Sequence, residues 1–419
     1  DLHSFPTRRS SDLQLEVGKE CGYPVMLKAA AGGGGRGMRI VRNEKEMEGE
    51  YKSARSEAAK AFGIDTIFIE KYIEKPKHIE VQVLGDKHGN LVHLYERDCS
   101  IQRRHQKVIE FTPALSITKE QRQAICKDAL KIAKAVNYRS AGTVEFLLDK
   151  DGNHYFIEMN PRIQVEHTVT EMVTGIDIVQ SQILVAEGYS LDSKEIAIEN
   201  QGAIQLKGHA IQCRITTEDP INGFAPDTGM IEEYKTASGF GIRLDGGNGF
   251  AGSVISPYYD SLLVKVTAFA RTFDGAINKA VRALSETKVK GVKTNIAFLL
   301  NVLQHSEFKK GNCDTNFIAD NPSLFHIQLG KDKKLKVLNF LGEKFVNGNK
   351  GHKPDFDIPV FPKIKQEEID SLEGTKQLFD KLGPKKFSDR VLKEKQLLIT
   401  DTTMRDQLEI GRASCRERV

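Results

Sequence analysis

Polar side chains occupy every second position of the segment FIEMNPRIQVEH, residues 156–167. They are Glu158, Asn160, Arg162, Gln164 and Glu166. Alternate side chains of an extended chain share one face, so these five groups would line one surface. Such a surface is either an ordinary solvated strand face or a site for an ion and a substrate.

Glu145 favours a site. It lies in TVEFLLD, which the turn KDGN at residues 150–153 connects to HYFIEMN, so the two segments are predicted to form a hairpin. Glu145 and Glu158 would then face each other, and two carboxylates at that distance repel unless a cation lies between them. Mg2+ commonly takes one or two carboxylates together with nucleotide phosphates. We therefore expect Glu145, Glu158 and Asn160 to bind magnesium or manganese.

A glycine-rich segment, GGGGRG at residues 32–37, follows a strand that contains Lys28. Glycine allows close approach of the backbone and positive φ, so successive amides can turn toward a phosphate. No Lys-Ser/Thr pair follows, which excludes a Walker A loop, and the next segment is a strand, unlike a dinucleotide fingerprint. The segment is either a phosphate-covering flap or a mobile hairpin tip, and Lys28 favours the flap.

The segment ERDCSIQRRHQKVIE, residues 96–110, gathers Arg97, Arg103, Arg104, His105 and Lys107. A short basic loop of this kind suits an anionic substrate such as phosphate or bicarbonate. The alternative is a solvated basic loop without a ligand.

The surrounding pattern predicts a mixed α/β protein. Strands are expected at PVMLKA, MRIV, TIFIEKYI and HIEVQVLG, the last forming a hairpin with LVHLYERD. Helices are expected from about Asn43 to Ala61, from a capping box at Thr118–Gln121 to about Val136, and near residues 170–187.

The 419 residues are enough for two or three domains, and the net charge of +4 is too small to imply a nucleic-acid partner. No apolar run approaches the roughly 20 residues of a membrane helix. The six cysteines are scattered without a CxxC pair, which favours free thiols in a reducing, cytoplasmic compartment. Residues 1–13 and 409–419 are Arg/Ser-rich and aperiodic, and we interpret them as non-native sequence or as short disordered tails.

Six motifs carry a resemblance to a known family. In chain order they are KAAAGGGGRGMRIV, EKYIEKPKHIEVQ, ERDCSIQRRHQK, TVEFL, FIEMNPRIQVEH and HAIQCRITTEDP. From about residue 14 to 325 the chain resembles the biotin carboxylase family of ATP-grasp enzymes. The resemblance implies a lid subdomain at 14–72, a catalytic subdomain at 73–215, a carboxyl-terminal region at 216–325 and a connecting region at 326–396. The family's amino-terminal Rossmann-like subdomain is not expected in this chain.

The resemblance also implies residue roles. For ATP the implied contacts are Lys28, Gly33, Gly34, Gly35, Glu70, Lys71, Ile73, His78, Gln82 and His105, with His78 and Gln82 on the ribose side. For bicarbonate they are Lys107, Arg162, Gln164, Val165 and Glu166, with Glu166 as general base. Arg214 is similar to the arginine that steadies the biotin enolate, and the biotin would arrive on a carrier domain that this chain does not contain.

The segment LLITDTTMRD, residues 397–406, resembles the start of the carboxyltransferase barrel of pyruvate carboxylases, where an aspartate matching Asp401 binds a metal. A chance polar strand end is the alternative, and Asp401 would have no companion ligands here. The expected function is ATP- and bicarbonate-dependent carboxylation of biotin through carboxyphosphate, the first half-reaction of a homo-oligomeric pyruvate carboxylase. Alternatives are a catalytically silent nucleotide-binding fragment, the biotin carboxylase of an acyl-CoA carboxylase, and a carbamoyl-phosphate synthase.

Overall fold

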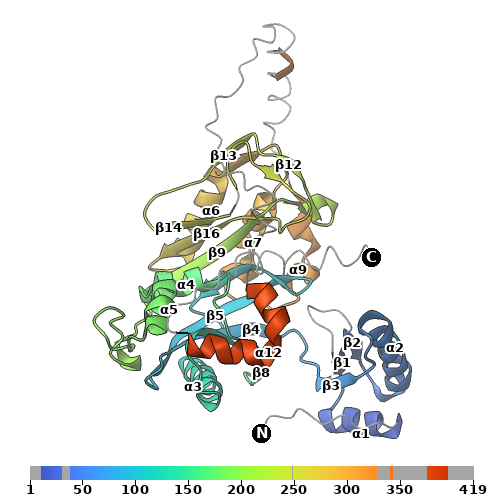
Figure 1. Ribbon diagram of the computed structural model, residues 1–419. Helices are drawn as coiled ribbons and strands as arrows, with labels where there is room; N and C mark the ends of the chain where they lie inside the picture. Colours follow the sequence, from blue (N-terminus) through green and yellow to red (C-terminus); the bar gives the residue numbers. More distant parts are fainter. Residues whose placement is uncertain (1–10, 31–37, 248, 328–339, 343–374, 395–419) are drawn as a thin grey trace.

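The structure, a computed structural model, describes residues 11–30, 38–247, 249–327, 340–342 and 375–394. In these ranges a small amino-terminal unit lies beside a larger body built on one wide sheet (Figure 1). Gly33, Gly34 and Gly35 of the glycine-rich segment lie outside the described residues, and so does Asp401.

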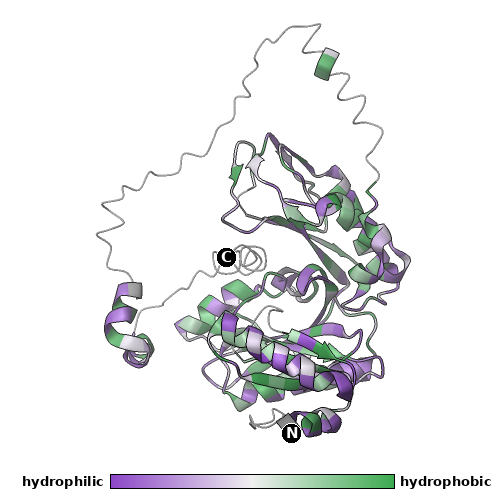
Figure 2. Ribbon diagram, turned by 90° about the vertical axis from the view of Figure 1, so that its right-hand side faces the viewer, coloured by the Kyte–Doolittle hydropathy of each residue, from purple (hydrophilic) through white to green (hydrophobic). Residues whose placement is uncertain are grey.

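The small unit is a three-stranded antiparallel sheet, in the order β2–β1–β3, packed with two helices. Its elements are α1 (Ser11–Cys21), β1 (Val25–Ala29), β2 (Met38–Val41), α2 (Glu44–Phe62) and β3 (Ile67–Lys71). The predicted start of α2 is confirmed, because the Asn43 side chain accepts hydrogen bonds from two backbone N–H groups of the first turn. Only Met47, Ala54 and Ala58 of α2 are buried, and its outer face, toward the viewer in Figure 2, is mostly hydrophilic.

The body is organised around an eight-stranded antiparallel sheet in the order β14–β16–β9–β6–β5–β4–β7–β8. The bounds are β4 (Lys77–Gly85), β5 (Leu91–Arg103), β6 (Gln106–Thr112), β7 (Ser140–Leu148), β8 (His154–Asn160), β9 (His209–Thr216), β14 (Ile242–Gly246) and β16 (Leu262–Ala270). Both predicted hairpins, β4–β5 and β7–β8, are confirmed.

The prediction of a basic loop at residues 96–110 is wrong, because most of this segment is strand. Strand β5 continues to Arg103 and β6 begins at Gln106, so only Arg104 and His105 form the turn, both with positive φ. The pairing of the backbone with neighbouring strands, together with carboxylate partners for the buried cations, stabilises charged residues inside a sheet.

Three helices pack against the central strands of the sheet and β7: α3 (Lys119–Ala135), α4 (His167–Thr174) and α5 (Ile178–Glu187). The capping box predicted at Thr118 and Gln121 is present at the start of α3. The single helix expected at 170–187 is instead two helices. Gly175, with φ 72°, ends α4, and the Asp177 side chain then caps α5.

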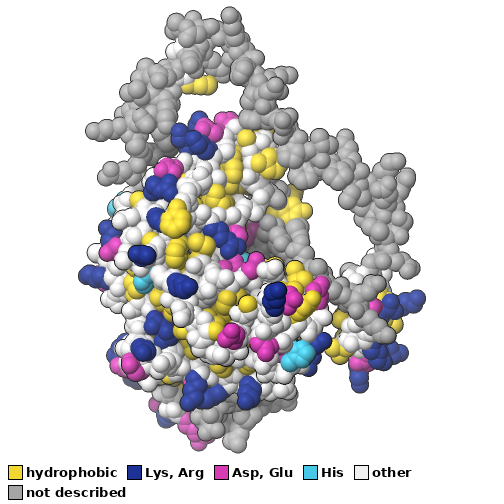
Figure 3. All heavy atoms as spheres, turned by 90° about the vertical axis from the view of Figure 1, so that its left-hand side faces the viewer, with side chains coloured by type: hydrophobic (Ala, Val, Ile, Leu, Met, Phe, Trp, Pro, Cys, Tyr) yellow, Lys and Arg dark blue, Asp and Glu magenta, His cyan; other side chains and the backbone are white. Residues whose placement is uncertain are grey.

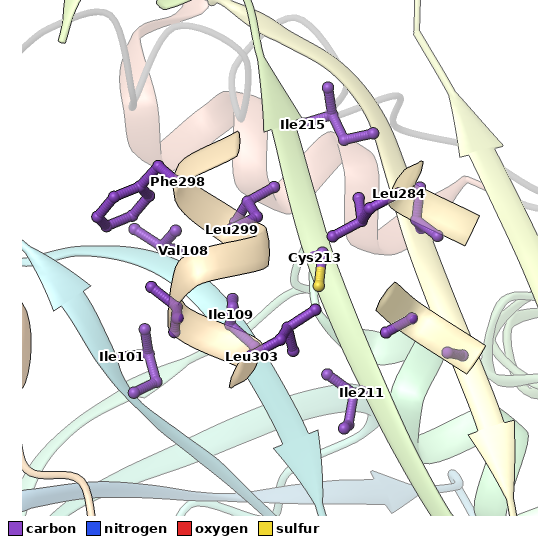
Figure 4. Close-up of a cluster of buried hydrophobic side chains, with 14 of the residues drawn as sticks. Ile101, Val108, Ile109, Ile211, Cys213, Ile215, Leu284, Phe298, Leu299 and Leu303 are labelled. Atoms are coloured by element: carbon purple, nitrogen blue, oxygen red, sulfur yellow. The ribbon is translucent and has the colours of Figure 1, made fainter. Parts of the chain in front are cut away.

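The carboxyl-terminal part of the body adds short strands and helices around the end of the sheet formed by β9, β16 and β14. They are β10 (Glu218–Asp219), β11 (Ala225–Pro226), β12 (Gly229–Met230), β13 (Glu233–Lys235), β15 (Val254–Ile255), α6 (Phe273–Glu286), β17 (Lys288–Lys290), α7 (Ile296–Gln304), α8 (Ser306–Lys309) and α9 (Phe317–Asp320), with 3-10 turns η2 (Pro220–Asn222) and η3 (Pro322–Phe325). A further 3-10 turn, η1 (Gln201–Ala203), precedes β9 and lies at β5, where the Gln201 side chain bonds the backbone of His93. Figure 4 shows the core here, where Cys213 of β9 lies among Leu284 of α6 and Leu299 and Leu303 of α7. All four are fully buried, which anchors β9 and its site residues.

Part of the predicted connecting region is helical. α12 (Thr375–Lys393) contains a kink at Gly383, with φ 74°, just before Pro384. Among the described residues no helix combines the length and apolarity needed to cross a membrane. On the face shown in Figure 3, basic and acidic side chains are interspersed and not separated by sign.

Candidate active site

A row of charged side chains crosses four strands of the wide sheet. Arg97 on β5 is in register with Glu80 on β4, Glu80 with Glu145 on β7, and Glu145 with Glu158 on β8. On β4 the polar residues alternate with apolar residues that pack against α3. The strand period therefore places the charged row on the face of the sheet that does not carry α3. Three adjacent glutamates on one face repel each other unless cations compensate them.

Lys107 on β6 supplies this compensation. Its Nζ lies 2.5 Å from Glu80 Oε2, 2.7 Å from Glu166 Oε1 and 3.1 Å from Glu145 Oε1. Burial alone would lower the pKa of Lys107, but the three carboxylates raise that pKa well above its usual range. Lys107 therefore stays a cation, and it joins the sheet to the loop that carries Glu166.

Glu145 and Glu158 point to the same side of the hairpin, as the alternation predicts. Nδ2 of Asn160 lies 3.0 Å from Glu145 Oε1 and 3.2 Å from Glu158 Oε1, donating to both. Nε2 of His78 lies 2.8 Å from the other oxygen of Glu145. Burial raises the pKa of Glu145, but Lys107 and His78 outweigh it and hold the pKa far below the usual range. The two acids and the amide are thus brought together, and metal binding by them stays a prediction.

The network is rich in carboxylates. Ion pairs link four of them, Glu80, Glu110, Glu145 and Glu166, to the basic groups Arg97, Lys107, Arg214 and His78. Two groups of side chains spaced to hold a metal lie here, His78–Glu80–Glu145 and Glu80–Cys99–Glu166. Carboxylate oxygens dominate both groups, which suits Mg2+ or Mn2+.

The loop after β8 brings two more predicted residues to the network. β8 ends at Asn160, directly before Pro161, as predicted. Gln164 accepts a hydrogen bond from Arg97 and donates one of 2.6 Å to Glu145. Arg162 donates to the carbonyl of Ile163, and the carbonyl of Val165 accepts from Lys265. Gln164 therefore lies within the charged network, and Val165 is bonded to Lys265, which is in register with Arg214.

Glu166 lies between two cations. Its oxygens accept from Lys107 at 2.7 Å and from Nη2 of Arg214 at 2.9 Å. Burial raises the pKa of Glu166, but Lys107, Arg214 and Arg97 outweigh it and hold the pKa well below its usual range. Glu166 is only 2% exposed, so it is a buried carboxylate that stays ionised.

Arg214 on β9 is itself fixed by Glu110 on β6. Its Nε lies 2.6 Å from Glu110 Oε1, and Gln212 donates to the second oxygen of Glu110 at 2.8 Å. Burial lowers the pKa of Arg214, but Glu110 and Glu166 raise it above its usual range. The guanidinium therefore bridges the sheet and the general-base candidate.

The residues predicted for the nucleotide fall into two groups. In the small unit Lys28 forms an ion pair of 2.5 Å with Glu70, and Lys71 donates to the carbonyl of Gly22. Ile73 follows β3 and is half-buried. In the body His78 joins the carboxylate network, whereas His105 is exposed at the β5–β6 turn.

Gln82 does not fit the ribose contact expected for it. It is fully buried, its oxygen accepts from Arg97 at 2.8 Å, and its nitrogen donates to the carbonyl of Gly142 at 2.9 Å. Both ends of the amide are used inside the protein, so in this structure Gln82 supports Arg97.

Sequence reasoning missed the buried acids Glu80 and Glu110 and gave Arg97 no individual role. A signal was present in HIEVQV, where His78, Glu80 and Gln82 alternate with β-branched residues as the polar side chains do in FIEMNPR. In KVIEF, Glu110 stands between the apolar residues Ile109 and Phe111 of a predicted strand. An acid at the inward position of a strand requires a partner, and that rule alone would have marked both residues.

The antiparallel sheet, the small unit beside it and the row of acids define an ATP-grasp enzyme of the ligase class. A family model for the carbamoyl-phosphate synthase L chain, ATP binding domain, matches residues 3–194, and one for the biotin carboxylase C-terminal domain matches residues 212–320. The match from residue 3 overlaps the range 1–13 that we interpret as non-native.

Relatives and solved structures identify the family. The chain is 52% identical to pyruvate carboxylase of Staphylococcus aureus over 95% of its length, and 54% identical to that of Bacillus subtilis over 93%. It spans about a third of these relatives, 35% and 34%. The biotin carboxylase domain of Hydrogenobacter thermophilus 2-oxoglutarate carboxylase, solved with MgADP and bicarbonate, is 48% identical with a TM-score of 0.70, over 76% of this chain and 69% of that one.

A second structure, the biotin carboxylase subunit of a pyruvate carboxylase, is 48% identical with a TM-score of 0.64, over 77% of this chain and 70% of that one. The chain therefore belongs to the biotin carboxylase family. Rhizobium etli pyruvate carboxylase, solved with the activator acetyl coenzyme A, is 50% identical with a TM-score of 0.72, over 93% of this chain and 35% of that one.

Proposed function

We propose that this chain catalyses the ATP- and bicarbonate-dependent carboxylation of biotin. One observation carries the proposal: Lys107 and Arg214 hold the buried Glu166 from two sides, next to the paired acids Glu145 and Glu158. This arrangement places a base, two cations for an anionic substrate and a candidate metal site within one network. The family membership and a bicarbonate-bound structural relative support the proposal.

Glu166 is a weak base while both cations are paired with it, because they stabilise its ionised form. An anion such as bicarbonate that draws Lys107 and Arg162 toward itself would weaken the Lys107–Glu166 pair. The pKa of Glu166 would then rise, and the carboxylate would accept the bicarbonate proton more readily. Substrate binding and activation of the base are thus coupled through Lys107.

The acids of the β7–β8 hairpin are the groups that would hold Mg2+ or Mn2+. Glu145 and Glu158 offer hard carboxylate oxygens, and Asn160 would offer its oxygen after turning away the amide nitrogen that now donates to both acids. A bound divalent ion would neutralise charge on the transferring phosphoryl group. Lys28 would serve the same phosphates after leaving Glu70, and His78 holds Glu145 in place meanwhile.

Carboxyphosphate formed from ATP and bicarbonate would release carbon dioxide for capture by the biotin ring nitrogen. Arg214, fixed by Glu110, would stabilise the enolate of biotin as that nitrogen loses its proton. A biotin carrier domain would present the biotin, and the parent protein would be a homo-oligomeric pyruvate carboxylase that converts pyruvate to oxaloacetate. The five free cysteines among the described residues fit a reducing, cytoplasmic location.

Bicarbonate-dependent ATP hydrolysis, with and without free biotin, tests the proposal. We expect hydrolysis that requires both Mg2+ and bicarbonate and that biotin stimulates, and we expect Glu166→Gln to lower kcat by about 100-fold or more. Glu286→Gln, which removes an exposed acid of α6, is the matched control and should leave hydrolysis unchanged. Nucleotide binding without turnover would support the silent fragment instead, and turnover that requires ammonia or glutamine would support a carbamoyl-phosphate synthase.

A further inference from the structure

Arg97 is a fully buried cation at the centre of the charged network. Its side chain donates five hydrogen bonds, to Glu80 Oε1 at 2.5 Å, Gln82 Oε1 at 2.8 Å, Gln164 Oε1 at 2.9 Å, Thr170 Oγ1 at 3.0 Å and Thr143 Oγ1 at 3.2 Å. These partners come from β4, β7, the loop after β8, and α4. All five N–H groups of the guanidinium are therefore used, and they join the sheet to the loop that carries the candidate base.

The bond to Gln164 fixes which end of its amide faces the site. Arg97 has only donors, so it selects the oxygen of Gln164. The amide nitrogen is then turned the other way, where it donates to Glu145 Oε1 at 2.6 Å. An N–H2 group on that side is the end of the amide that an anionic substrate requires.

The bond from Arg97 to Glu80 affects how strongly the protein holds Lys107. One oxygen of Glu80 accepts from Arg97, and the other, at 2.5 Å, from Lys107. Without Arg97 the buried Glu80 would have Lys107 as its one cationic partner among the described residues. Lys107 would then be held more strongly by the protein and released less readily to a substrate.

We propose that Arg97 is a positioning residue for the bicarbonate end of the site. It acts through Gln164 and Glu80 and touches no reacting atom. This inference rests on the proposed function, because Gln164 and Lys107 are the groups assigned to bicarbonate.

The planar fork of the arginine matters, in addition to its charge. A lysine at position 97 would restore one positive charge, but its three donors on a flexible stem cannot replace five donors in a plane. Arg97→Lys therefore separates a positioning role from charge balance alone. Arg97→Met removes both charge and donors.

Arg122→Met is the matched control. Arg122 forms a 2.8 Å ion pair with Glu96, which is fully buried like Glu80 and directly precedes Arg97 on β5. Arg122 belongs to α3, on the face of the sheet away from the charged row. The control therefore removes a guanidinium from a buried glutamate without touching the site.

Amide hydrogen exchange without ligands gives the first measurement. We expect Arg97→Met to raise exchange of peptides covering residues 160–170 by about tenfold or more, a loss of about 1.4 kcal/mol of local protection. Arg122→Met should instead raise amide exchange of peptides around residues 113–122. Equal changes in both variants, or no increase at 160–170, would overturn the proposal.

The second measurement is bicarbonate-dependent ATP hydrolysis by the same proteins. We expect the KM for bicarbonate to rise about tenfold or more in Arg97→Met and in Arg97→Lys, with the KM for ATP changed by less than about twofold. Equal rises of both KM values, or full recovery in Arg97→Lys, would contradict positioning. If the unsubstituted chain shows no bicarbonate response, the proposed function fails, while the exchange measurement still decides whether Arg97 orders the loop.

Discussion

Replacing Lys107 with methionine tests the electrostatic account of the site most directly. Methionine keeps an unbranched side chain of similar length but removes the charge that Glu80, Glu145 and Glu166 share. Breaking a buried ion pair by removing one partner costs about 3–5 kcal/mol. We expect a loss near the lower end of this range at pH 8, because Glu80 keeps Arg97 and Glu166 keeps Arg214.

The loss should depend on pH in a defined direction. In the unsubstituted chain the pKa values of Glu145 and Glu166 are lowered by Lys107, so these acids stabilise the fold above the unfolded value of about 4.3 and lose that contribution as pH falls. Without Lys107 these pKa values move upward, because burial is then opposed only by His78 at Glu145 and by Arg214 and Arg97 at Glu166. The variant therefore has less of this stabilisation to lose as pH falls. The difference in unfolding free energy is therefore largest at pH 8 and smaller at pH 5.

Urea denaturation followed by circular dichroism at pH 8 and pH 5 measures this difference. The control is Lys131→Met, which removes an exposed lysine of α3 that pairs with Asp128 and should have no measurable effect. A loss in Lys107→Met no larger than in the control, or a loss of equal size at both pH values, would refute the reasoning.

Three further predictions concern the metal site, the packing of the sheet and a buried acid. Glu158→Gln should weaken Mn2+-dependent binding of ADP by about tenfold or more, measured by calorimetry, while metal-free binding of ADP stays unchanged. Gly142→Ala should lower the free energy of unfolding by about 1–3 kcal/mol, because a Cβ there would lie 2.6 Å from the Tyr138 ring. Gly49→Ala, in open space on α2, should raise it by about 0.5–1 kcal/mol. Urea denaturation measures both changes. Burial raises the pKa of Asp260 to about 7, so its ionised form destabilises the fold above that pH. Asp260→Asn should then raise the melting temperature at pH 8 more than at pH 5, and an equal change at both would contradict it.

Local elements were predictable because their signals lie within a few residues. The caps at Asn43 and Thr118 stand two or three residues before the backbone groups they satisfy, and the turn KDGN predicts the β7–β8 hairpin. The turn by itself would place Glu145 opposite Ile157, and an irregularity between Glu145 and Phe146 shifts the register so that Glu145 pairs with Glu158. The break at Gly175 was also visible in principle, since glycine followed by an acid commonly ends one helix and caps the next.

The composition of the charged row was not predictable in the same way. Alternation shows that Glu80 and Glu145 each share a face with their strand neighbours, but it does not show that β4 and β7 are adjacent across about sixty residues. For the same reason the basic cluster at residues 96–110 was predicted to be a loop. Its strands, β5 and β6, are buried against segments that lie far away in the sequence.

The sequence alone determined the types of chemistry this protein carries: paired acids with an amide, a loop bearing an arginine and a base, and the motif order of its family. Tertiary structure alone decided which charges compensate which, placing Lys107 among three carboxylates and Arg97 at five acceptors. The physical reason is that electrostatic energy depends on distance and burial, which strand order sets and residue spacing does not.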